Sequence, residues 1–523
     1  MQIQFRVLGL SDQVSSKLRE VVQLKPGNWD DYSFKTSFDA TYIDVHGNRI
    51  ELGTLKIGYV DQPKGWTREK IPAAFESLPD GWFSLGQDVD YYKTVRSSLK
   101  PELCAAILLA LKDVVNSEEL LVVAANELVF RESLTRGVGL STIKDQFKRV
   151  LNGQAELTDF HFSYAQDGNE KNAAVAINFR VSAGSTPSSN VHVLIGRNGV
   201  GKTTLLNNMV RTLMQETKRE SEPLCQFHLE EEFLDRKPLP HSYFSNVVSV
   251  SFSAFDPFLP PPDQQDRSQG PAFFYIGMKN ARSGAQSTEA LTPKTSGDLV
   301  NDFVSSFKSC LSQPAKKARW LTAIRRLASD SNFADMALER LIDLDDKEAA
   351  RAAGAIAGRM SSGHSIVLLT ITKLVDTVQE KALVLIDEPE SHLHPPLLSA
   401  FTRALSDLLH DRNGVAIVAT HSPVVLQEVP RSCVWKLTRI RAQGRSDRPE
   451  RETFGENVGI LTREVFGLEV SKSGFHEILQ HSVDAGGSYE SICGNYRDQL
   501  GTEARAILLT LIANRDASSE FTQ

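Results

Sequence analysis

The sequence predicts an α/β fold built on a parallel β-sheet. Three short runs consist almost entirely of apolar residues, as expected of strands that are covered on both faces: 191–195, 383–386 and 415–420. A glycine-rich loop and an amphipathic helical pattern follow the first run, which is the strand, loop and helix order of parallel sheets. The chain has 523 residues, so further structural units are expected around this core.

The glycine-rich loop matches the pattern G-x-x-x-x-G-K-[ST] at every fixed position. Glycines allow the backbone to form a concave nest of N–H groups, and the following helix N-terminus favours an anion there. Lys202 is expected to hold the β- and γ-phosphates of ATP, and Thr203 to offer its hydroxyl to Mg²⁺. The alternative is a glycine turn without a ligand. The residues predicted to bind nucleotide are Gly196, Asn198, Gly199, Gly201, Lys202, Thr203 and Thr204.

Charged or titratable residues follow the other two apolar runs. Asp387 and Glu388 end the second run, where Asp387 is expected to bind Mg²⁺ and Glu388 to polarise the attacking water. An acidic turn is the alternative. His421 follows the third run, where it could contact the γ-phosphate and sense hydrolysis, although a histidine at a strand end is often structural. The predicted catalytic residues are therefore Glu388 and His421, and the predicted metal ligands are Thr203 and Asp387.

A fourth motif, Ser361-Ser362-Gly363-His364, opens an apolar stretch shortly before the acidic strand. Together the four motifs resemble those of the ABC-type ATPase superfamily. The resemblance implies an ABC-type ATPase head, with a phosphate-loop parallel core sheet and an antiparallel subdomain. It also implies that Ser361, Ser362 and Gly363 of one head close over a nucleotide held by a second head. ATP and Mg²⁺ would then occupy composite sites, and the protein would be at least a homodimer.

Finer details resemble the OLD-like and SMC-like branch of this superfamily. The relevant segments are 387–395 and 420–423, and His394 takes the dimer-contact position that aspartate usually holds. The signature and the segments 251–258 and 454–459 further resemble the Septu (PtuA-like) ATPase of bacterial anti-phage defence, including its retron-linked versions. That resemblance implies a separate HNH nuclease subunit as a partner.

One departure from the superfamily pattern stands out, and one expected residue has several candidates. A glutamine that binds Mg²⁺ should follow the strand at 247–252, but Ser253 and Asp256 lie there instead; Asp256 is the preferred substitute, and Ser253, Gln264 and Gln265 are alternatives. An aromatic residue that stacks on adenine should precede the phosphate loop. Its candidates are Phe160, Phe162 and Tyr164, of which two are expected to be packing residues.

The composition places the protein in the cytoplasm. No apolar run approaches the ~18 residues of a membrane span, and the first residues lack the layout of a secretory signal. The net charge is −7, so no global basic field attracts nucleic acid. The five cysteines are scattered without C-x-x-C spacing, which disfavours disulfides and zinc sites and indicates buried thiols: Cys104, Cys225, Cys310, Cys433 and Cys493.

An arginine-rich segment leaves a local interaction with nucleic acid open. It contains Arg439, Arg441, Arg445, Arg448 and Arg451. A solvated hairpin tip is one interpretation, and a contact to DNA, RNA or an acidic protein is the other.

The chain is expected to divide into five intervals. These are an N-terminal α+β region (1–155), an ATPase lobe with the phosphate loop (156–258), loops and a helical insertion (259–355), a second ATPase lobe with the signature, the acidic strand and the switch histidine (356–480), and a C-terminal helical tail (481–523). Residues 1–8 could instead contribute a strand to the ATPase sheet.

No fused effector is recognisable, because the residues after His421 hold no convincing set of nuclease ligands. The leading hypothesis is a regulatory ATPase whose nucleotide-driven oligomeric state controls a separate nuclease subunit in anti-phage defence. The alternative is a RecF-like or SMC-like repair or recombination ATPase that acts directly on DNA. A transporter subunit is disfavoured by the residues after Glu388.

Overall fold

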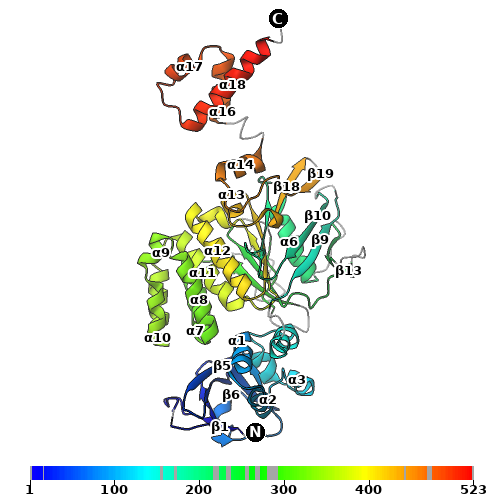
Figure 1. Cartoon of the computed structure of the whole chain (residues 1–523), viewed down its shortest axis with the longest axis vertical. Coiled ribbons are helices and arrows are strands. Elements are labelled where there is room, and N and C mark those ends of the chain that lie inside the picture. The colour runs from blue at the N-terminus through cyan, green and yellow to red at the C-terminus, as the bar shows by residue number, and fades with distance from the viewer. Residues whose placement is uncertain are drawn as a thin grey trace.

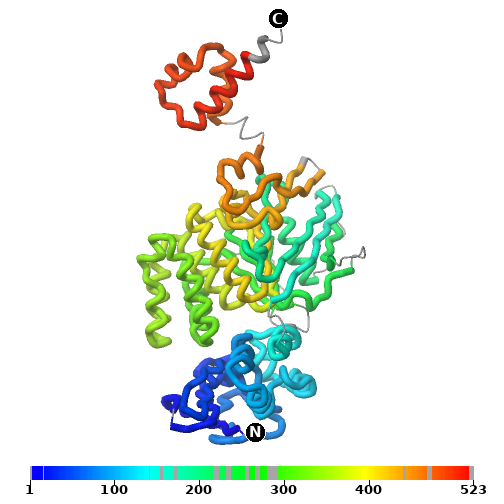
Figure 2. The backbone as a smooth tube through the Cα atoms, viewed as in Figure 1, coloured from blue at the N-terminus to red at the C-terminus, as the bar shows by residue number. Residues whose placement is uncertain are grey.

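The computed structural model of the chain contains three units that follow one another along its longest axis (Figure 1). The structure describes residues 3–15, 17–153, 157–169, 173–215, 223–230, 237–253, 258–264, 271–279, 293–440, 443–467 and 474–520. The tube in Figure 2 runs from the N-terminal unit through a large central unit to a small helical unit near the C-terminus. No helix in this described part of the chain combines the length and apolar character that a membrane crossing requires.

The N-terminal unit is a six-stranded sheet covered by short helices. The sheet order is β7-β1-β2-β4-β5-β8, in which β1 and β2 are parallel and the other neighbours antiparallel. Because β1 pairs with β2 and β7, residues 4–7 belong to this sheet and not to the ATPase sheet. The strands are β1 (Gln4–Val7), β2 (Val21–Pro26), β4 (Ser37–Ile43), β5 (Arg49–Tyr59), β7 (Ala74–Phe75) and β8 (Trp82–Gly86), with β3 (Phe34–Lys35) and β6 (Gly65–Trp66) as a separate pair. The helices are α1 (Val89–Ser98), α2 (Pro101–Ala110), α3 (Glu118–Ala125), α4 (Leu140–Thr142) and α5 (Lys148–Leu151).

The central unit is built on a seven-stranded sheet with the order β15-β14-β16-β17-β11-β18-β19. All neighbours are parallel except the last pair, a hairpin. The three apolar runs become β11, β16 and β17, which are buried along their whole length, as predicted. The strands are β11 (Val191–Ile195), β14 (Asn246–Ser251), β15 (Ala272–Gly277), β16 (Leu383–Asp387), β17 (Val415–Thr420), β18 (Val434–Ile440) and β19 (Gln443–Asp447).

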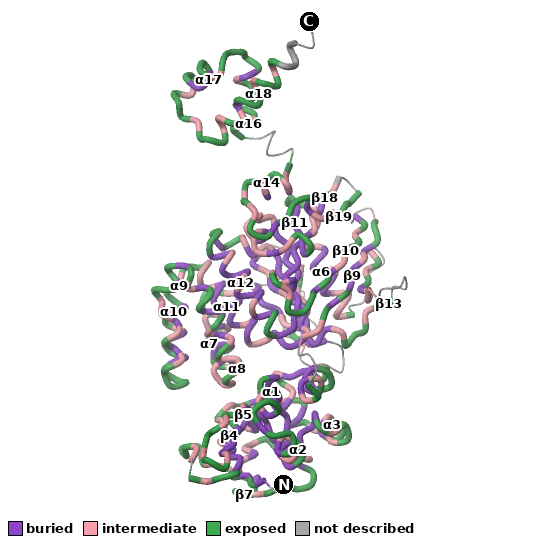
Figure 3. The backbone as a smooth tube through the Cα atoms, in the orientation of Figure 1, coloured by how far each residue is buried: buried purple, intermediate pink, exposed green. Residues whose placement is uncertain are grey.

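Two layers cover this sheet, and its buried strands form the centre of Figure 3. One face packs against helices, chiefly α7 (Ser296–Leu311), α8 (Pro314–Leu327), α11 (Ser362–Thr377) and α12 (Pro395–Asp411). The other packs against α6 (Lys202–Leu213) and a four-stranded antiparallel sheet of order β10-β9-β12-β13. Those strands are β9 (Phe160–Gln166), β10 (Val175–Val181), β12 (Cys225–Leu229) and β13 (Lys237–Pro238). This parallel core sheet with an antiparallel subdomain agrees with the fold predicted from the sequence.

The interval 259–355 is not limited to loops and helices. Residues 272–277 form β15, a parallel edge strand of the ATPase sheet. The helical part comprises α7, α8, α9 (Ser331–Asp335) and α10 (Asp346–Ala357), and its apolar faces join the core of the sheet. Sequence patterns missed β15 because the segment lies between two regions rich in Pro, Gly and Ser.

The C-terminal unit is a small helical group with its own core. It contains α16 (Phe475–Asp484), α17 (Tyr489–Asn495) and α18 (Thr502–Glu520), packed around Val483, Ile492, Cys493 and Leu508. An ion pair joins Arg463 of α14 (Val458–Phe466) to Glu503 of α18.

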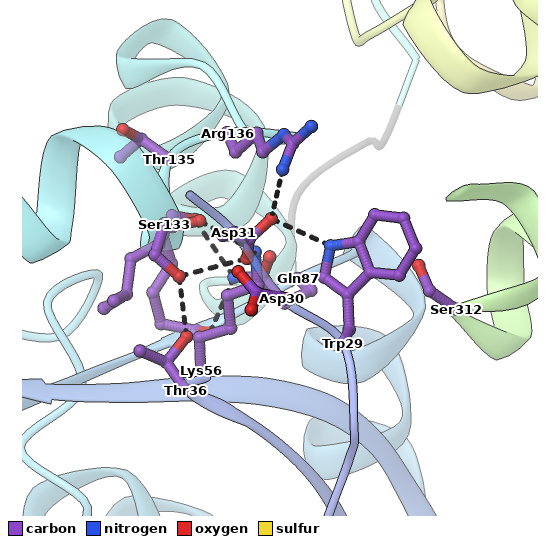
Figure 4. Close-up of polar contacts among 12 residues, drawn as sticks. Trp29, Asp30, Asp31, Thr36, Lys56, Gln87, Ser133, Thr135, Arg136 and Ser312 are labelled. Atoms are coloured by element: carbon purple, nitrogen blue, oxygen red, sulfur yellow. Dashed lines mark hydrogen bonds and ion pairs between the residues drawn. The ribbon is translucent and has the colours of Figure 1, made fainter. Parts of the chain in front are cut away.

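A polar cluster in the N-terminal unit faces the helical layer of the ATPase (Figure 4). The buried Lys56 ammonium lies 2.6 Å from Asp31 Oδ2 and donates to the carbonyl of Ser133. Arg136 and the Trp29 indole also donate to Asp31. Burial tends to raise the pKa of Asp31, but the cationic neighbours, Lys56 first, bring it below its ordinary value. Each buried charge is therefore paired, which is what burial requires.

Charged residues also join the N-terminal unit to the central unit. Asp88, at the N-terminus of α1, accepts hydrogen bonds from Arg319 of α8 (2.5 Å) and Arg412 at the end of α12 (3.2 Å). Although burial opposes ionisation, the two guanidinium groups hold the pKa of Asp88 at about 2. Asp88 therefore fixes α1 to two helices of the central unit.

Candidate functional site

The predicted site residues gather at one edge of the central sheet because the carboxyl ends of parallel strands meet there. The phosphate loop follows β11, Glu388 follows β16 and His421 follows β17. Since β17 lies between β11 and β16 in the sheet, His421 falls between the phosphate loop and the acidic pair.

The phosphate loop leads directly into α6. Gly201, at the helix N-cap, has a φ of 99°, a left-handed conformation that favours glycine. The Lys202 side chain is buried, and its Nζ donates to the carbonyls of Gly196 (3.0 Å) and Arg197 (3.1 Å). Burial lowers the pKa of Lys202, and the nearby carboxylates, Glu388 first, oppose this shift. The lysine therefore lies folded along the loop, within reach of an anion bound in it.

A cavity of about 270 Å³ opens beside the loop. Its lining includes five of the residues predicted to bind nucleotide: Gly199, Gly201, Lys202, Thr203 and Thr204. Glu388 lies on the same cavity. Of the other two predicted loop residues, Asn198 is exposed and Gly196 is buried beneath the loop.

The two predicted metal ligands are in contact. Thr203 Oγ1 donates to Asp387 Oδ1 at 3.2 Å. Both residues also line a small second cavity with Ser251, which pairs with Asp387 across β14 and β16. A hydroxyl and a carboxylate beside a phosphate loop are the oxygen ligands that Mg²⁺ prefers, so this donor set fits the ion.

Glu388 has a left-handed backbone, with φ 46° and ψ 58°. Its amide donates to the carbonyl of Ala419 on β17, which holds this conformation in place. The carboxylate is 30% exposed, and its Oε1 lies 4.0 Å from His421 Nδ1. Glu388 is thus accessible from the cavity.

Glu390 is a site residue that sequence reasoning missed. Its Oε1 accepts the backbone N–H of His421 (2.6 Å) and lies 2.9 Å from His421 Nδ1. The hydrogen bond to Glu390 is the main reason why the pKa of His421 is raised above its ordinary value. Burial works to raise the pKa of Glu390, but hydrogen bonds, first from His421, bring it below its ordinary value. Glu390 therefore orients the ring and favours its charged form.

The signature lies at the start of α11, away from the cavity lining described above. Ser361 caps the helix by accepting the His364 amide, and its Oγ lies 2.6 Å from His364 Nδ1. A Cβ on Gly363 would come within 2.5 Å of the carbonyl of His392, so glycine is needed for this packing. Ser362 is exposed at the first helical position.

Two histidines join the signature to the segment after Glu388. His364 Nε2 lies 3.4 Å from Asp330 Oδ1, and His394 Nε2 lies 3.1 Å from Asp330 Oδ2. These three residues have the side chains of a transition-metal site, and their potential ligand atoms are within 4.8 Å of one another. However, the Leu397 amide donates to His394 Nδ1, which leaves the ring proton on Nε2, facing Asp330. The geometry is that of a hydrogen-bonded set that ties the start of α11 to the start of α12.

The structure contradicts the prediction of an adenine-stacking aromatic and one of the alternatives for the glutamine position. Phe160, Phe162 and Tyr164 are all buried in the core between the two sheets, and none lines the cavity. Gln264 bridges to Phe273, and its amide donates to the carbonyl of Pro271, so it does not take the glutamine position. Asp256 and Gln265 lie outside the described residues. Of the two serines at the end of β14, Ser251 and not Ser253 lines a cavity together with Asp387.

Known proteins share these features to different extents. Residues 277–427 match the family described as "AAA domain, putative AbiEii toxin, Type IV TA system"; this stretch holds the signature, the acidic pair and His421. Among solved structures, an ATP-binding cassette of an ABC transporter in its ADP conformation is 13% identical, with a TM-score of 0.31, and covers 61% of this chain and 100% of its own. The cbiO1 protein of Clostridium perfringens, part of an ABC transporter complex, is 15% identical, with a TM-score of 0.26, over 52% of this chain and 83% of its own.

A much closer relative extends over the whole chain. Protein ea59 of Escherichia phage lambda is 46% identical over 532 residues, which cover 98% of this chain and 99% of that protein. The similarity thus includes the N-terminal and C-terminal units as well as the ATPase head. The chain belongs to the same family as protein ea59 of phage lambda.

Proposed function

We propose that the chain is a Mg²⁺-dependent ATPase that binds ATP in the cavity beside the phosphate loop. The observation that carries this proposal is the convergence of Lys202, Thr203, Asp387 and Glu388 at one edge of the sheet. The loop amides and Lys202 bind the phosphates, while Thr203 and Asp387 hold Mg²⁺. When bound, the ion neutralises charge on the phosphate oxygens.

Glu388 positions and polarises the attacking water in this proposal. Its carboxylate reaches the cavity and stands 4.0 Å from His421. His421, held by Glu390 in a geometry that favours its charged form, contacts the γ-phosphate and responds to its loss. Phosphoryl transfer demands this kind of positioning more than covalent chemistry.

The active unit is proposed to be a homodimer with two composite sites. Ser361, Ser362 and Gly363 of one copy close over ATP held by the other, as the resemblance to ABC-type ATPases implies. Ser362 is exposed at the helix N-terminus, where backbone amides and the helix dipole favour an anion supplied by a partner.

We further propose that the nucleotide-driven dimer regulates a separate nuclease subunit in anti-phage defence in the cytoplasm. The Septu resemblance supports an HNH nuclease as that subunit. A relative in phage lambda fits a role exercised during phage infection. The alternative, a RecF-like or SMC-like ATPase that acts directly on DNA, uses the same site chemistry.

One experiment tests the ATPase, and a second identifies what it controls. Purified protein should release phosphate from ATP in a Mg²⁺-dependent way, and Lys202→Ala should abolish this by removing a charge-assisted contact. Turnover equal to that of the wild type in Lys202→Ala would refute the site assignment.

The second experiment is expression with the neighbouring genes, followed by affinity purification and mass spectrometry. A nuclease in defined stoichiometry supports the regulatory proposal. Steeply salt-dependent duplex binding by the isolated chain, with no protein partner, favours direct action on DNA.

A further inference from the structure

The β18–β19 hairpin forms one wall of the nucleotide cavity. β18 pairs with the β11 residues that directly precede the phosphate loop. The β18–β19 hairpin then extends beyond the carboxyl end of β11. A Cβ on Gly196 would come within 2.4 Å of the carbonyl of Leu437, so the hairpin backbone lies directly against the loop. The hairpin residues on the cavity are Leu437, Thr438, Arg439, Gly444, Arg445 and Ser446.

The antiparallel subdomain holds this hairpin in place. The Trp435 indole donates to the carbonyl of Asn178 on β10, and Arg448 donates to the Asn178 side chain at 2.9 Å. The Arg448 guanidinium also stacks 3.7 Å from the Trp435 ring. A Cβ on Gly444 would come within 2.6 Å of the Ala173 side chain, which shows how closely the hairpin packs beside β10.

The arginines of this hairpin therefore differ in their surroundings. Arg448 is structural, and burial lowers its pKa to about 10. Arg445 is 79% exposed and ion-paired with Asp447 at 2.7 Å. Arg439 is partly buried, lines the cavity and stands directly across the hairpin from Gly444. Arg441 lies outside the described residues.

Two arginines of the hairpin, Arg439 and Arg445, line the cavity, and they lie on opposite faces of the hairpin. Successive side chains of a strand point to opposite faces, so Arg439 shares a face with Leu437. Leu437 packs in the core between the central sheet and the antiparallel subdomain; Val175 and Val200 pack against the same core, and all three line the cavity. Arg439 thus lies on the face that carries Leu437, and it is more buried than Arg445, which is ion-paired with Asp447.

No aromatic residue occurs among the described residues that line this cavity, and the three candidates for an adenine-stacking aromatic are buried elsewhere. A planar guanidinium can take their place, because it stacks on aromatic faces and remains charged. We propose that Arg439 holds the base of the bound nucleotide, against the apolar surface of Leu437 and Val175. This proposal rests on the proposed ATP binding and adds the residue that recognises the base.

The test compares two ligands that share phosphates but not a base. Binding of Mg-ATP and of inorganic tripolyphosphate is measured calorimetrically for the wild type, Arg439→Ala and Lys202→Ala. Arg451→Ala, an exposed arginine of the same segment outside the cavity lining, is the matched control. Melting temperatures confirm that each variant folds.

The expected result is selective for the base. Arg439→Ala should weaken ATP binding roughly tenfold and leave tripolyphosphate binding within about twofold of the wild type. Lys202→Ala should weaken both ligands, and Arg451→Ala neither. Arg439→Lys should rescue only part of the loss, because an ammonium is not planar.

Other outcomes separate this proposal from the one it rests on. Unchanged ATP binding in Arg439→Ala, or equal weakening of both ligands, would overturn the role of Arg439 in holding the base while leaving the ATP site intact. Failure of the wild-type protein to bind ATP would instead overturn the proposed function itself.

Discussion

Glu388 occupies a backbone conformation that glutamate rarely adopts. Its φ of 46° lies in the left-handed region, and such strain costs about 1–3 kcal/mol and persists mainly where function requires it. In this conformation the Glu388 carboxylate lines the cavity, and the Glu388 backbone amide donates a hydrogen bond to the carbonyl of Ala419. The strain therefore supports a catalytic role for this residue over an acidic turn.

Replacing Glu388 should separate hydrolysis from binding. Glu388→Gln keeps the shape and the backbone contact but removes the base, so phosphate release should fall by at least about 100-fold. ATP-bound dimers should accumulate, and light scattering after gel filtration measures them. Glu339→Gln, an exposed carboxylate of the helical region, is the control. Substantial hydrolysis by Glu388→Gln would remove the residue from the catalytic role.

Glu390 is expected to control the pH dependence of turnover through His421. Its hydrogen bond raises the pKa of His421, so the imidazolium persists to higher pH than in a free histidine. If the charged ring contacts the γ-phosphate, activity falls as pH rises through this raised pKa. Glu390→Gln weakens the ion pair and should move the fall to lower pH. The measurement is kcat between pH 6 and 9, and an unchanged profile would show that Glu390 is only structural.

At the scale of elements, β11 places a titratable side chain, His192, in the core beside the phosphate loop. His192 is fully buried, packs edge-on against Phe179, and burial lowers its pKa from 6.5 to about 3. The folded state thus contains the neutral ring, while the unfolded state takes up a proton below pH 6.5. The contribution of the neutral His192 to the free energy of unfolding is fully present above pH 6.5 and is lost as the pH falls from there toward 3.

This linkage predicts a specific pH effect on stability. Between pH 7.5 and 5, titration of His192 should remove about 2 kcal/mol of unfolding free energy. His192→Leu should lack this component, so its stability relative to the wild type should improve on acidification. Chemical denaturation at both pH values measures the difference, and His481→Leu on the exposed surface of α16 is the control. Equal pH sensitivity in wild type and His192→Leu would contradict the assignment.

The elements that the sequence predicts well are those with local signals. The apolar runs of β11, β16 and β17 and the phosphate loop were all recognisable, because burial on both faces and the loop pattern leave direct traces in the sequence. The order of the sheet then brings Lys202, Asp387 and Glu388 together. The run that forms β15 was hidden between two regions rich in Pro, Gly and Ser, and the pairing of β1 with β2 and β7 leaves no such trace.

Residues whose role depends on tertiary packing escaped prediction. Glu390 resembles any acidic residue in a turn until β17 brings His421 beside it. Arg439 looked like part of a solvated arginine cluster until the hairpin packed against the phosphate loop. Phe160, Phe162 and Tyr164 have the alternation of a strand, but that pattern does not distinguish a core facing another sheet from a wall of a cavity.

At the scale of the whole molecule, α12 links the carboxyl edge of the central sheet to the N-terminal unit. Its first residue follows His394, which meets the signature through Asp330, and Arg412 just after its last residue contacts Asp88. A helix of 17 residues spans about 25 Å as a nearly rigid element. A movement of the signature region on dimer closure would therefore reach the N-terminal unit without an intervening flexible loop.

Dimer closure itself is tested by mixing two inactive variants. Lys202→Ala lacks a functional phosphate loop, and Ser362→Arg blocks the signature at an exposed position without the backbone clash that a side chain at Gly363 would cause. In composite sites the two defects fall in one site of a mixed dimer and leave the other site intact. A 1:1 mixture with random exchange should recover about a quarter of wild-type phosphate release if the sites act independently. Each variant alone, at the same total concentration, is the control. If the mixture stays inactive although subunit exchange is demonstrated by a tag on one variant, independent composite sites between two copies are excluded.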